Sequence, residues 1–181
     1  TMASERSEGT DQNPMRNIRI GKVTVNVSTG KSGEPLEKAK KILSQLTGQN
    51  PCLRKARKTI KDFGIRKGEP VACLVTLRRE KAEDFLKKAF EAVGNKLEES
   101  CFDGRGNLAF GIKEHIEIPG TRYMPELGIV GMDVGISLER RGYRVKRRSI
   151  GRSSIGKKHW VTKEEAIQFV KDNFRTEIVE G

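Results

Sequence analysis

The positive charge of this chain is concentrated in two segments that cannot bury a core. Residues 54–67 carry seven lysines and arginines against one aspartate, a net charge of +6. Residues 139–158 carry nine against one glutamate, a net charge of +8. The whole chain of 181 residues has a formal net charge of +12, so everything outside the two segments sums to −2. The remaining, nearly neutral part of the chain must therefore form the core. The two basic segments repel themselves on the protein surface, and a bound polyanion would relieve this repulsion.

This distribution of charge is typical of proteins that bind nucleic acids, since a generic basic protein would spread its charge. A solvated surface loop is the alternative for either segment taken alone. With 35% hydrophobic residues, the remainder can bury the core of one domain. We expect residues 1–14 to be a disordered polar tail and residues 15–181 to be a single RNA-binding domain. Within it, residues 139–160 are expected to be a basic extension that orders only on RNA.

Alternating apolar and polar residues predict strands in several places. The clearest is Ile18–Ser28, where the apolar face changes at Gly21 and indicates a β-bulge. Its other face carries uncharged hydrogen-bonding groups, which point either to solvent or to a ligand: Thr24, Asn26 and Ser28. Further strands are expected at residues 52–60, where the pattern is weak, and at residues 71–77, 108–118 and 132–138.

Apolar residues at helical spacing predict three helices. They cover residues 32–48, where Ser32 is the expected cap, residues 81–98, and residues 162–174, which begin with a T-x-x-E capping box. Because helices do not separate every pair of strands, the sheet is expected to be mixed or mostly antiparallel. The predicted fold class is α+β: a single two-layer domain with about five strands, helices on one face of the sheet and a long basic hairpin.

Cysteine usage and hydropathy argue against several classes of protein. Cys52, Cys73 and Cys101 are odd in number and far apart, so we expect reduced thiols and no metal site. The chain contains no phosphate-loop pattern, and no cofactor is expected. No apolar run approaches the ~20 residues that span a bilayer, and no signal peptide is visible. We therefore expect a cytoplasmic protein that does not interact with membranes.

An RNA-modifying or RNA-cleaving enzyme is a second hypothesis. His115 lies beside Glu114 and near Glu117, but adjacent residues of a strand point to opposite faces, so we expect a surface histidine rather than a general base. Asp103 and Asp133 have no partner that their spacing identifies. A general nucleic-acid-binding or membrane-surface protein is a third hypothesis, although the chain shows neither a basic recognition helix nor a basic amphipathic helix with exposed aromatic residues.

Long collinear motifs make the chain resemble one known family. They are NPMRNIRIGKVTVNVSTGKSGE, LTGQNPCLRKARKTIKDFGIRKGEPVA, FDGRGNLAFGIKEHIEIPG and GMDVGISLERRGYRVKRR, and they extend the resemblance from about Asn13 to Phe174. All resemble the large-subunit ribosomal proteins that bind 5S ribosomal RNA, called "L five" in bacteria and "L eleven" in eukaryotes. The closing IGKKHWVTKEEA stretch resembles archaeal and eukaryotic members.

The resemblance implies a helix-covered antiparallel sheet in the central protuberance of the large subunit. There it implies contacts with 5S ribosomal RNA, with the large ribosomal RNA and with neighbouring ribosomal proteins, including a small-subunit head protein. The long hairpin of the family reaches toward peptidyl-site (P-site) tRNA, and the matching hairpin here is residues 55–70.

The candidate contacts with ribosomal RNA share a basic or amide side chain on a strand end, a turn, the stems of the hairpin or the extension. They are Arg16, Lys22, Asn26, Lys55, Arg57, Lys58, Arg66, Lys67, Arg78, Arg105, Arg147, Arg148, Lys157 and Lys158. The candidate contact with P-site tRNA is the tip of the hairpin, Lys61, Asp62, Phe63 and Gly64. No residue is expected to be catalytic.

Overall fold

The computed structural model describes residues 13–121 and 124–179. Residues 1–12 of the predicted polar tail lie outside the described residues. The last two residues of that tail, Asn13 and Pro14, are exposed and begin a turn in which the Arg16 N–H donates to the Asn13 carbonyl oxygen (2.8 Å).

Five strands form one antiparallel sheet, in the order β2–β3–β1–β6–β5. The central strand β1 (Ile18–Ser28) lies between β3 (Pro70–Leu77) and β6 (Met132–Arg140). The edges are β2 (Cys52–Lys55) and β5 (Asn107–Ile112). The predicted α+β class and the mostly antiparallel sheet of about five strands are confirmed.

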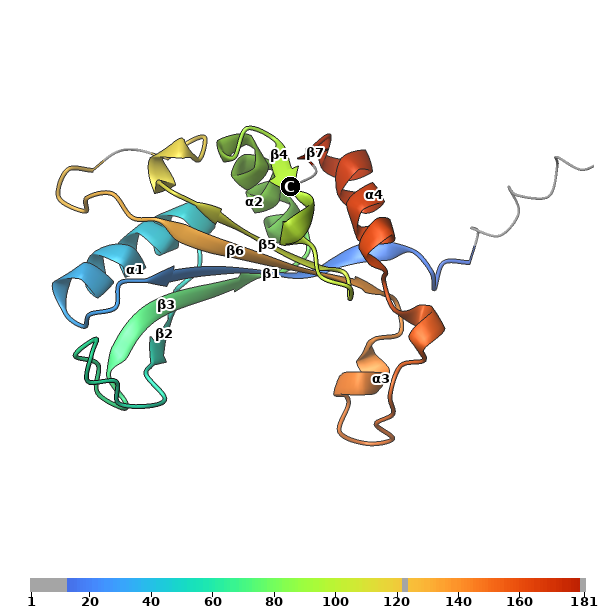
Figure 1. The fold of residues 1–181 in the computed structure, drawn as a ribbon, viewed down its shortest axis with the longest axis horizontal. Coiled ribbons are helices and arrows are strands. Elements are labelled where there is room, and N and C mark those ends of the chain that lie inside the picture. The colour runs from blue at the N-terminus through green and yellow to red at the C-terminus, as the bar shows by residue number, and fades with distance from the viewer. Residues whose placement is uncertain (1–12, 122–123, 180–181) are drawn as a thin grey trace, which may run out of the picture.

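Three helices cover one face of this sheet, as Figure 1 shows: α1 (Glu34–Thr47), α2 (Glu80–Ala92) and α4 (Lys163–Phe174). Each has an apolar stripe at helical spacing, and the stripes pack on the inward side chains of the strands in one continuous core. Val25 of β1 and Phe90 of α2 are at most 1% exposed in this core. The predicted two-layer arrangement is confirmed, and it leaves the opposite face of the sheet without a helical cover.

The bulge predicted in β1 is present. The register of β1 against β6 shifts between Ile20 and Lys22, which leaves Gly21 as the extra residue. Before the bulge the apolar side chains are Ile18 and Ile20, and after it they begin at Val23, so the bulge keeps both sets on the core side.

A second, two-stranded parallel sheet was not predicted from the sequence. It pairs β4 (Lys96–Glu98) with β7 (Glu177–Val179), beyond the ends of helices α2 and α4 (Figure 1). Leu97 falls within the range predicted for the second helix, residues 81–98, but it is a buried residue of β4.

The reason is an early end of α2, which was expected to reach residue 98. Gly94 and Asn95 follow the helix with positive φ angles of 71° and 56°, and two left-handed residues in succession turn the chain out of the helix.

Two strands are also shorter than predicted. The weak strand expected at residues 52–60 ends at Lys55, and the strand expected at residues 108–118 ends at Ile112. The pairing register with the neighbouring strand ends at the same points, although beyond β2 the backbone of Ala56 still pairs with that of Gly68 and Glu69 across the hairpin.

The expected Ser32 cap of α1 is wrong. The N-cap residue is Gly33, and the Ser32 hydroxyl donates instead to the carboxylate of Glu69 (2.5 Å). This contact ties the loop before α1 to the base of the basic hairpin. The predicted capping box of α4 is present, with Thr162 and Glu165 bonded to each other's backbone N–H groups.

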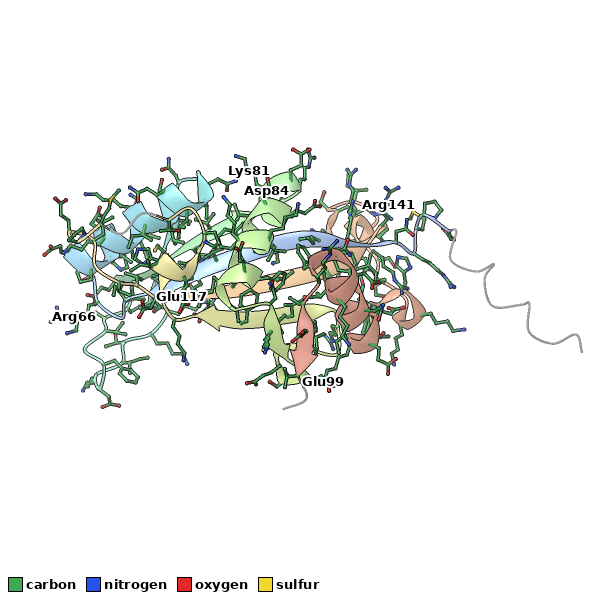
Figure 2. The ribbon with its side chains drawn as sticks, turned by 90° about the horizontal axis from the view of Figure 1, so that it is seen from above. Arg66, Lys81, Asp84, Glu99, Glu117 and Arg141 are labelled. Atoms are coloured by element: carbon green, nitrogen blue, oxygen red, sulfur yellow. The ribbon has the colours of Figure 1, made fainter. Side chains whose placement is uncertain are left out.

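Both basic segments lie on the side of the sheet that faces away from the helices (Figure 1). The basic hairpin, residues 56–69, connects β2 to β3. The second basic segment, residues 141–161, follows β6 and contains the short helix α3 (Arg144–Arg147). Arg66 of the hairpin and Arg141 of the second segment lie toward opposite ends of the molecule (Figure 2). The two segments therefore flank the open face of the sheet.

Candidate nucleic-acid interface

Most side chains on the open face of the sheet are small or uncharged, with Lys22 and Asp133 as charged exceptions. One row across four strands consists of Thr76, Thr24, Gly135 and Ala109, and the neighbouring row consists of Lys22, Ser137 and Asn107. These rows offer hydroxyl and amide groups with few large side chains between them. Such a surface suits a partner whose backbone and hydroxyl groups approach closely, as the shallow minor groove of an RNA helix does.

Two glycines on this face are not required by the packing of the protein itself. A Cβ atom at Gly111 would meet nothing closer than the Asp133 Oδ1 at 3.9 Å, and one at Gly135 nothing closer than the Thr24 carbonyl oxygen at 3.9 Å. These are ordinary contact distances, whereas glycine inside a strand weakens the strand. Close approach of a partner from outside explains these glycines better than internal packing does.

The basic hairpin has an ordered stem and an exposed tip. Ile60 and Ile65 exchange two backbone hydrogen bonds, of 2.9 and 3.1 Å, and close a four-residue turn formed by the candidate residues 61–64. Phe63 in this turn is 73% exposed. A phenyl ring with this exposure can stack on an unpaired base.

The base of the hairpin is held by Glu69. Its carboxylate accepts hydrogen bonds from the Ser32 hydroxyl and from the Arg66 N–H (3.0 Å), and these two bonds lower the pKa of Glu69. The five basic stem candidates are all exposed: Lys55, Arg57, Lys58, Arg66 and Lys67.

One ion pair ties the second basic segment to the sheet, and two further contacts tie its beginning to its end. Arg147 of α3 pairs with the buried Glu139 of β6. The His159 Nε2 lies 2.8 Å from the Arg141 carbonyl oxygen, and the Tyr143 hydroxyl donates to the His159 carbonyl (3.4 Å). The expectation that the segment orders only on RNA stays a prediction, and in the structure the pairing of Arg147 with Glu139 gives the segment a defined path beside β6.

The apex of this segment points to solvent. Ile150 is 88% exposed, and the Arg148 Nε donates to the Gly151 carbonyl (2.7 Å). Lys157 and Lys158 are exposed as well. All of these side chains are accessible to a partner.

The turn that carries Arg105 is rigidly built. The Asp103 carboxylate accepts three hydrogen bonds: from the Arg105 N–H (2.8 Å), from the Asn107 N–H (2.7 Å) and from the Asn107 Nδ2 (2.7 Å). Burial alone would raise the pKa of Asp103, but these bonds outweigh burial and lower it. The Asn107 Oδ1 in turn accepts from the Ser137 hydroxyl (2.7 Å) on the open face.

The same turn packs directly on the second basic segment. Gly106 has a φ of +72°, and a Cβ atom there would lie 2.7 Å from the Val161 side chain, so only glycine allows this approach. The contact brings the guanidinium carbon of Arg105 to 5.2 Å from the ring centroid of Trp160. At this distance the cation interacts with the face of the ring.

Four of the predicted RNA contacts line one cavity of about 880 Å³ between the sheet and the second basic segment: Lys22, Arg78, Arg105 and Arg147. The sequence analysis missed most of the remaining lining, which includes Asn107, Ser137, Tyr143, Lys146, Arg152, Ser153, Ser154 and Trp160. The alternation of β5 and β6 could have placed Asn107 and Ser137 on the open face. The approach of Trp160 to Arg105 has no signal in the sequence.

The other candidates lie outside this cavity. Arg16 is exposed just before β1, and Asn26 donates to the Asp133 carboxylate (3.4 Å) farther along the open face. Arg148, Lys157 and Lys158 lie on the second basic segment but do not line the cavity.

His115 is not the surface histidine that the sequence predicted. It lies in a short 3-10 helix rather than in a strand, and it is 2% exposed. Its Nδ1 accepts from the Val130 N–H (3.3 Å), and its backbone N–H donates to the Val130 carbonyl (3.0 Å). Burial lowers the pKa of His115. The residue therefore fastens the loop before β6 to the end of β5, a structural role.

The cysteines lie where thiols were expected. Cys52 opens β2, Cys73 is buried in β3, where burial raises the pKa of its thiol, and all three are free within the described residues. Across residues 13–121 and 124–179, no three histidine, cysteine or acidic side chains cluster as metal ligands. In the same part of the chain, no helix combines the length and hydropathy that crossing a bilayer requires.

The open sheet face and its two basic flanks define an α+β protein suited to binding folded RNA. Comparison with known proteins gives the family. A family model that describes the C-terminus of the ribosomal L5 family matches residues 70–169, and one described as ribosomal protein L5 matches residues 13–66. The chain belongs to the ribosomal protein L5 family.

Curated relatives agree over nearly the whole chain. The chain is 52% identical to the large ribosomal subunit protein uL5 of Sulfolobus acidocaldarius, over 96% of this chain and 98% of the relative. It is 54% identical to uL5 of Sulfurisphaera tokodaii, over 93% and 96%, and 48% identical to uL5 of Methanococcus maripaludis, over 93% and 95%. These archaeal relatives confirm the predicted family. It is a family of structural ribosomal proteins rather than enzymes, so the enzyme hypothesis is wrong and the ribosomal location is as predicted.

Proposed function

We propose that this protein is a structural component of the large ribosomal subunit that binds 5S ribosomal RNA and helps attach it to the large ribosomal RNA in the central protuberance. The basic hairpin reaches from there toward P-site tRNA. Neighbouring ribosomal proteins, including one of the small-subunit head, complete the set of partners. The protein needs no cofactor for this role.

One observation carries the proposal. The helices cover one face of the sheet (Figure 1), and the other face carries mostly small, uncharged side chains and is flanked at both ends by the basic segments. Hydroxyl and amide groups at the centre match the 2′-hydroxyls of RNA, while the cations at the flanks match its phosphates.

A general nucleic-acid-binding protein is the alternative, and it predicts a different preference. It would bind through charge alone, so duplex DNA would compete as well as RNA. The face proposed here depends on the 2′-hydroxyl and on close approach to glycine, so it discriminates against DNA.

The discriminating experiment is filter binding of labelled 5S ribosomal RNA with unlabelled 5S RNA or duplex DNA as competitor. We expect the RNA to compete far better than the DNA at equal nucleotide concentration. Equal competition would overturn the proposal. Salt dependence adds a second readout: Arg16→Ala and Arg105→Ala should each reduce the slope of log K against log salt by roughly one unit, since each removes about one phosphate contact.

A variant of the open face tests the surface itself. Gly135→Val adds a side chain where the protein has room for one and favours the strand, so the fold should be retained. The added methyl groups should weaken 5S RNA binding about tenfold or more by blocking close approach. The matched control is Gln168→Val on the exposed face of α4, which should leave binding unchanged. If both variants bind like the parent protein, the open face is not the RNA surface.

A further inference from the structure

The cavity between the sheet and the second basic segment is deep enough to hold more than a phosphate. Its volume of about 880 Å³ falls in the range of small-molecule sites, about 300–1,000 Å³. Its walls come from strands of the open face, from the Arg105 turn and from residues 143–160. It opens beside the face that the proposed function assigns to 5S RNA.

The charge of the lining selects an anion. Six lysines and arginines face the cavity: Lys22, Arg78, Arg105, Lys146, Arg147 and Arg152. Among the described residues of the lining, Glu139 is the single carboxylate, and it is paired with Arg147. Cations remain in excess in a partly enclosed site, where their attraction for a phosphate is screened less than on the open surface.

The remaining lining selects a flat group that accompanies the anion. Trp160 is partly exposed rather than a member of the core, and the planar guanidinium of Arg105 lies over its ring. Aromatic rings and guanidinium planes are the surfaces on which proteins stack unpaired RNA bases. Around them the lining offers neutral hydrogen-bonding groups from Asn107, Ser137, Ser153 and Ser154. A bare phosphate would need none of these groups.

Contacts within the protein itself hold this arrangement. The three hydrogen bonds to Asp103 fix the turn, and the contact of Gly106 with Val161 fixes its distance from the second basic segment. Because Arg105 is positioned by its backbone, a bound base would lose little affinity to ordering of the site.

From these observations we infer that the cavity receives a single nucleotide extruded from the bound RNA. Its base stacks on the Arg105–Trp160 pair, and its phosphate lies among the surrounding cations. The inference rests on the proposed RNA-binding function and adds to it a base-dependent contact. The nucleotide comes from a loop or bulge, since unstacking a paired base costs more.

Trp160 provides a site-specific readout, because it is the single tryptophan of the chain. The probes are a single-stranded RNA trinucleotide and the same trinucleotide without its central base, which carries the same phosphates. The complete RNA should quench the fluorescence of Trp160 and bind about tenfold or more tightly than the abasic RNA, as expected for one stacked base. Equal quenching and equal affinity would show an anion site without base recognition and would overturn the inference.

A conservative variant separates stacking from charge. Arg105→Lys keeps the positive charge and removes the planar group, so it should lower the affinity for the complete trinucleotide more than the affinity for the abasic RNA and shrink the difference between the two severalfold. The matched control is Arg19→Lys, an exposed arginine of β1 outside the cavity, which should preserve the difference. If Arg105→Lys also preserves the difference, the base does not stack on this pair.

The competition of 5S RNA with duplex DNA, measured on the same full-length protein, separates this inference from the proposed function. Preference for 5S RNA without a base-dependent change at Trp160 would overturn the cavity assignment alone. Base-dependent quenching without preference for 5S RNA would overturn the proposed function and leave the cavity assignment standing.

Discussion

The carboxylate of Glu139 lies directly over Gly21, at the position that a side chain would need. A Cβ atom on Gly21 would meet the Glu139 Oε1 at 2.3 Å and its Cδ at 2.5 Å. The bulge of β1 thus opens a passage through which Glu139 of β6 reaches Arg147 of the second basic segment. The absence of a side chain at Gly21 leaves room for Glu139, and Glu139 joins the sheet to the second basic segment through Arg147.

This relationship predicts that Gly21→Ala and Glu139→Ala are coupled. Gly21→Ala should displace the Glu139 side chain and lower the free energy of unfolding by about 1–3 kcal/mol, as overpacking does. In the Glu139→Ala background the same change should cost little, which gives a coupling energy of at least about 1 kcal/mol. Urea denaturation of the four proteins of the cycle measures it. Simple additivity would show that Gly21 is needed for another reason.

His115 predicts a loss of stability on acidification. Its folded-state pKa lies below its ordinary value of 6.5, so the unfolded chain binds the proton more readily. The contribution of neutral His115 to the free energy of unfolding is therefore fully present above pH 6.5. It is lost as the pH falls from 6.5 through the lower pKa of the folded state. A proton on Nδ1 would also remove the acceptor of the Val130 N–H.

Two substitutions check this assignment. His115→Asn keeps an acceptor for the Val130 N–H and does not titrate, so the free energy of unfolding should lose this part of its pH dependence. His159→Asn is the control, because the His159 ring is only half-buried and contacts the Arg141 carbonyl outside the core. Denaturation midpoints measured between about pH 5 and pH 8, the range in which histidine charges change, should respond to the first substitution and not to the second.

Glu165 has two roles that different substitutions separate. One oxygen accepts from the Thr162 N–H in the capping box of α4, and the other pairs with the buried Arg140 at the end of β6 (2.5 Å). Glu165→Gln keeps the capping box and removes the ion pair, so it should cost about 1–2 kcal/mol. Glu165→Ala removes both and should cost about 1 kcal/mol more. Thermal denaturation that ranks the two variants equally would assign all of the effect to the ion pair.

The spacing of apolar residues along the sequence predicts most strands and helices of this fold, but it does not predict which strands pair with each other. The alternation in β1 and β6 identified both strands and the bulge, because one face of each is buried. The spacing of apolar residues also predicted that the second helix reaches residue 98, because Leu97 continues the helical spacing. The helix ends at Ala92, and Gly94 follows it with a positive φ angle. Leu97 belongs instead to β4, which pairs with β7 near the C-terminus of the sequence. No local sequence pattern predicts this pairing.

The site shows the same division between local and tertiary information. Charge density located the two basic segments, and glycine turns located Arg105. The cavity was not predictable, because it depends on Gly106 packing against Val161 and on Trp160 coming to Arg105, which are tertiary contacts. The contact between the second basic segment and the sheet was not predictable for a related reason, since the buried partner of Arg147 belongs to β6.

The folded path of the second basic segment predicts where a protease cuts the free protein. Contacts hold His159 to Tyr143 and to Arg141, while the apex around Ile150 is exposed. Trypsin should therefore cut first after Arg148 and Arg152 rather than after Arg141, and 5S ribosomal RNA should protect these sites. Mass spectrometry of the early fragments identifies the cuts. First cleavage after Arg141 would mean that the segment is detached in solution.

The last prediction concerns the tip of the basic hairpin, which protrudes beyond the stem that is expected to hold RNA. Ile60 and Ile65 already form a hydrogen-bonded antiparallel pair, so residues 61–64 can be replaced by Asn-Gly, the preferred two-residue hairpin turn. This replacement removes Phe63 and leaves the stem and its contact with Glu69 intact. Ordered loops of more than about 12 residues usually have a function, and contact with a second RNA would explain why the tip of this hairpin protrudes.

Large subunits that carry the shortened hairpin should contain normal amounts of 5S ribosomal RNA, because the stem and the open face are unchanged. Ribosomes assembled from them should bind tRNA more weakly in the peptidyl site. Phe63→Leu is the matched variant: it keeps the length and charge of the tip and should reproduce part of the defect if the ring stacks on RNA. Loss of 5S RNA from the subunits would make the tip an assembly element, and normal tRNA binding in both variants would leave it a solvated turn.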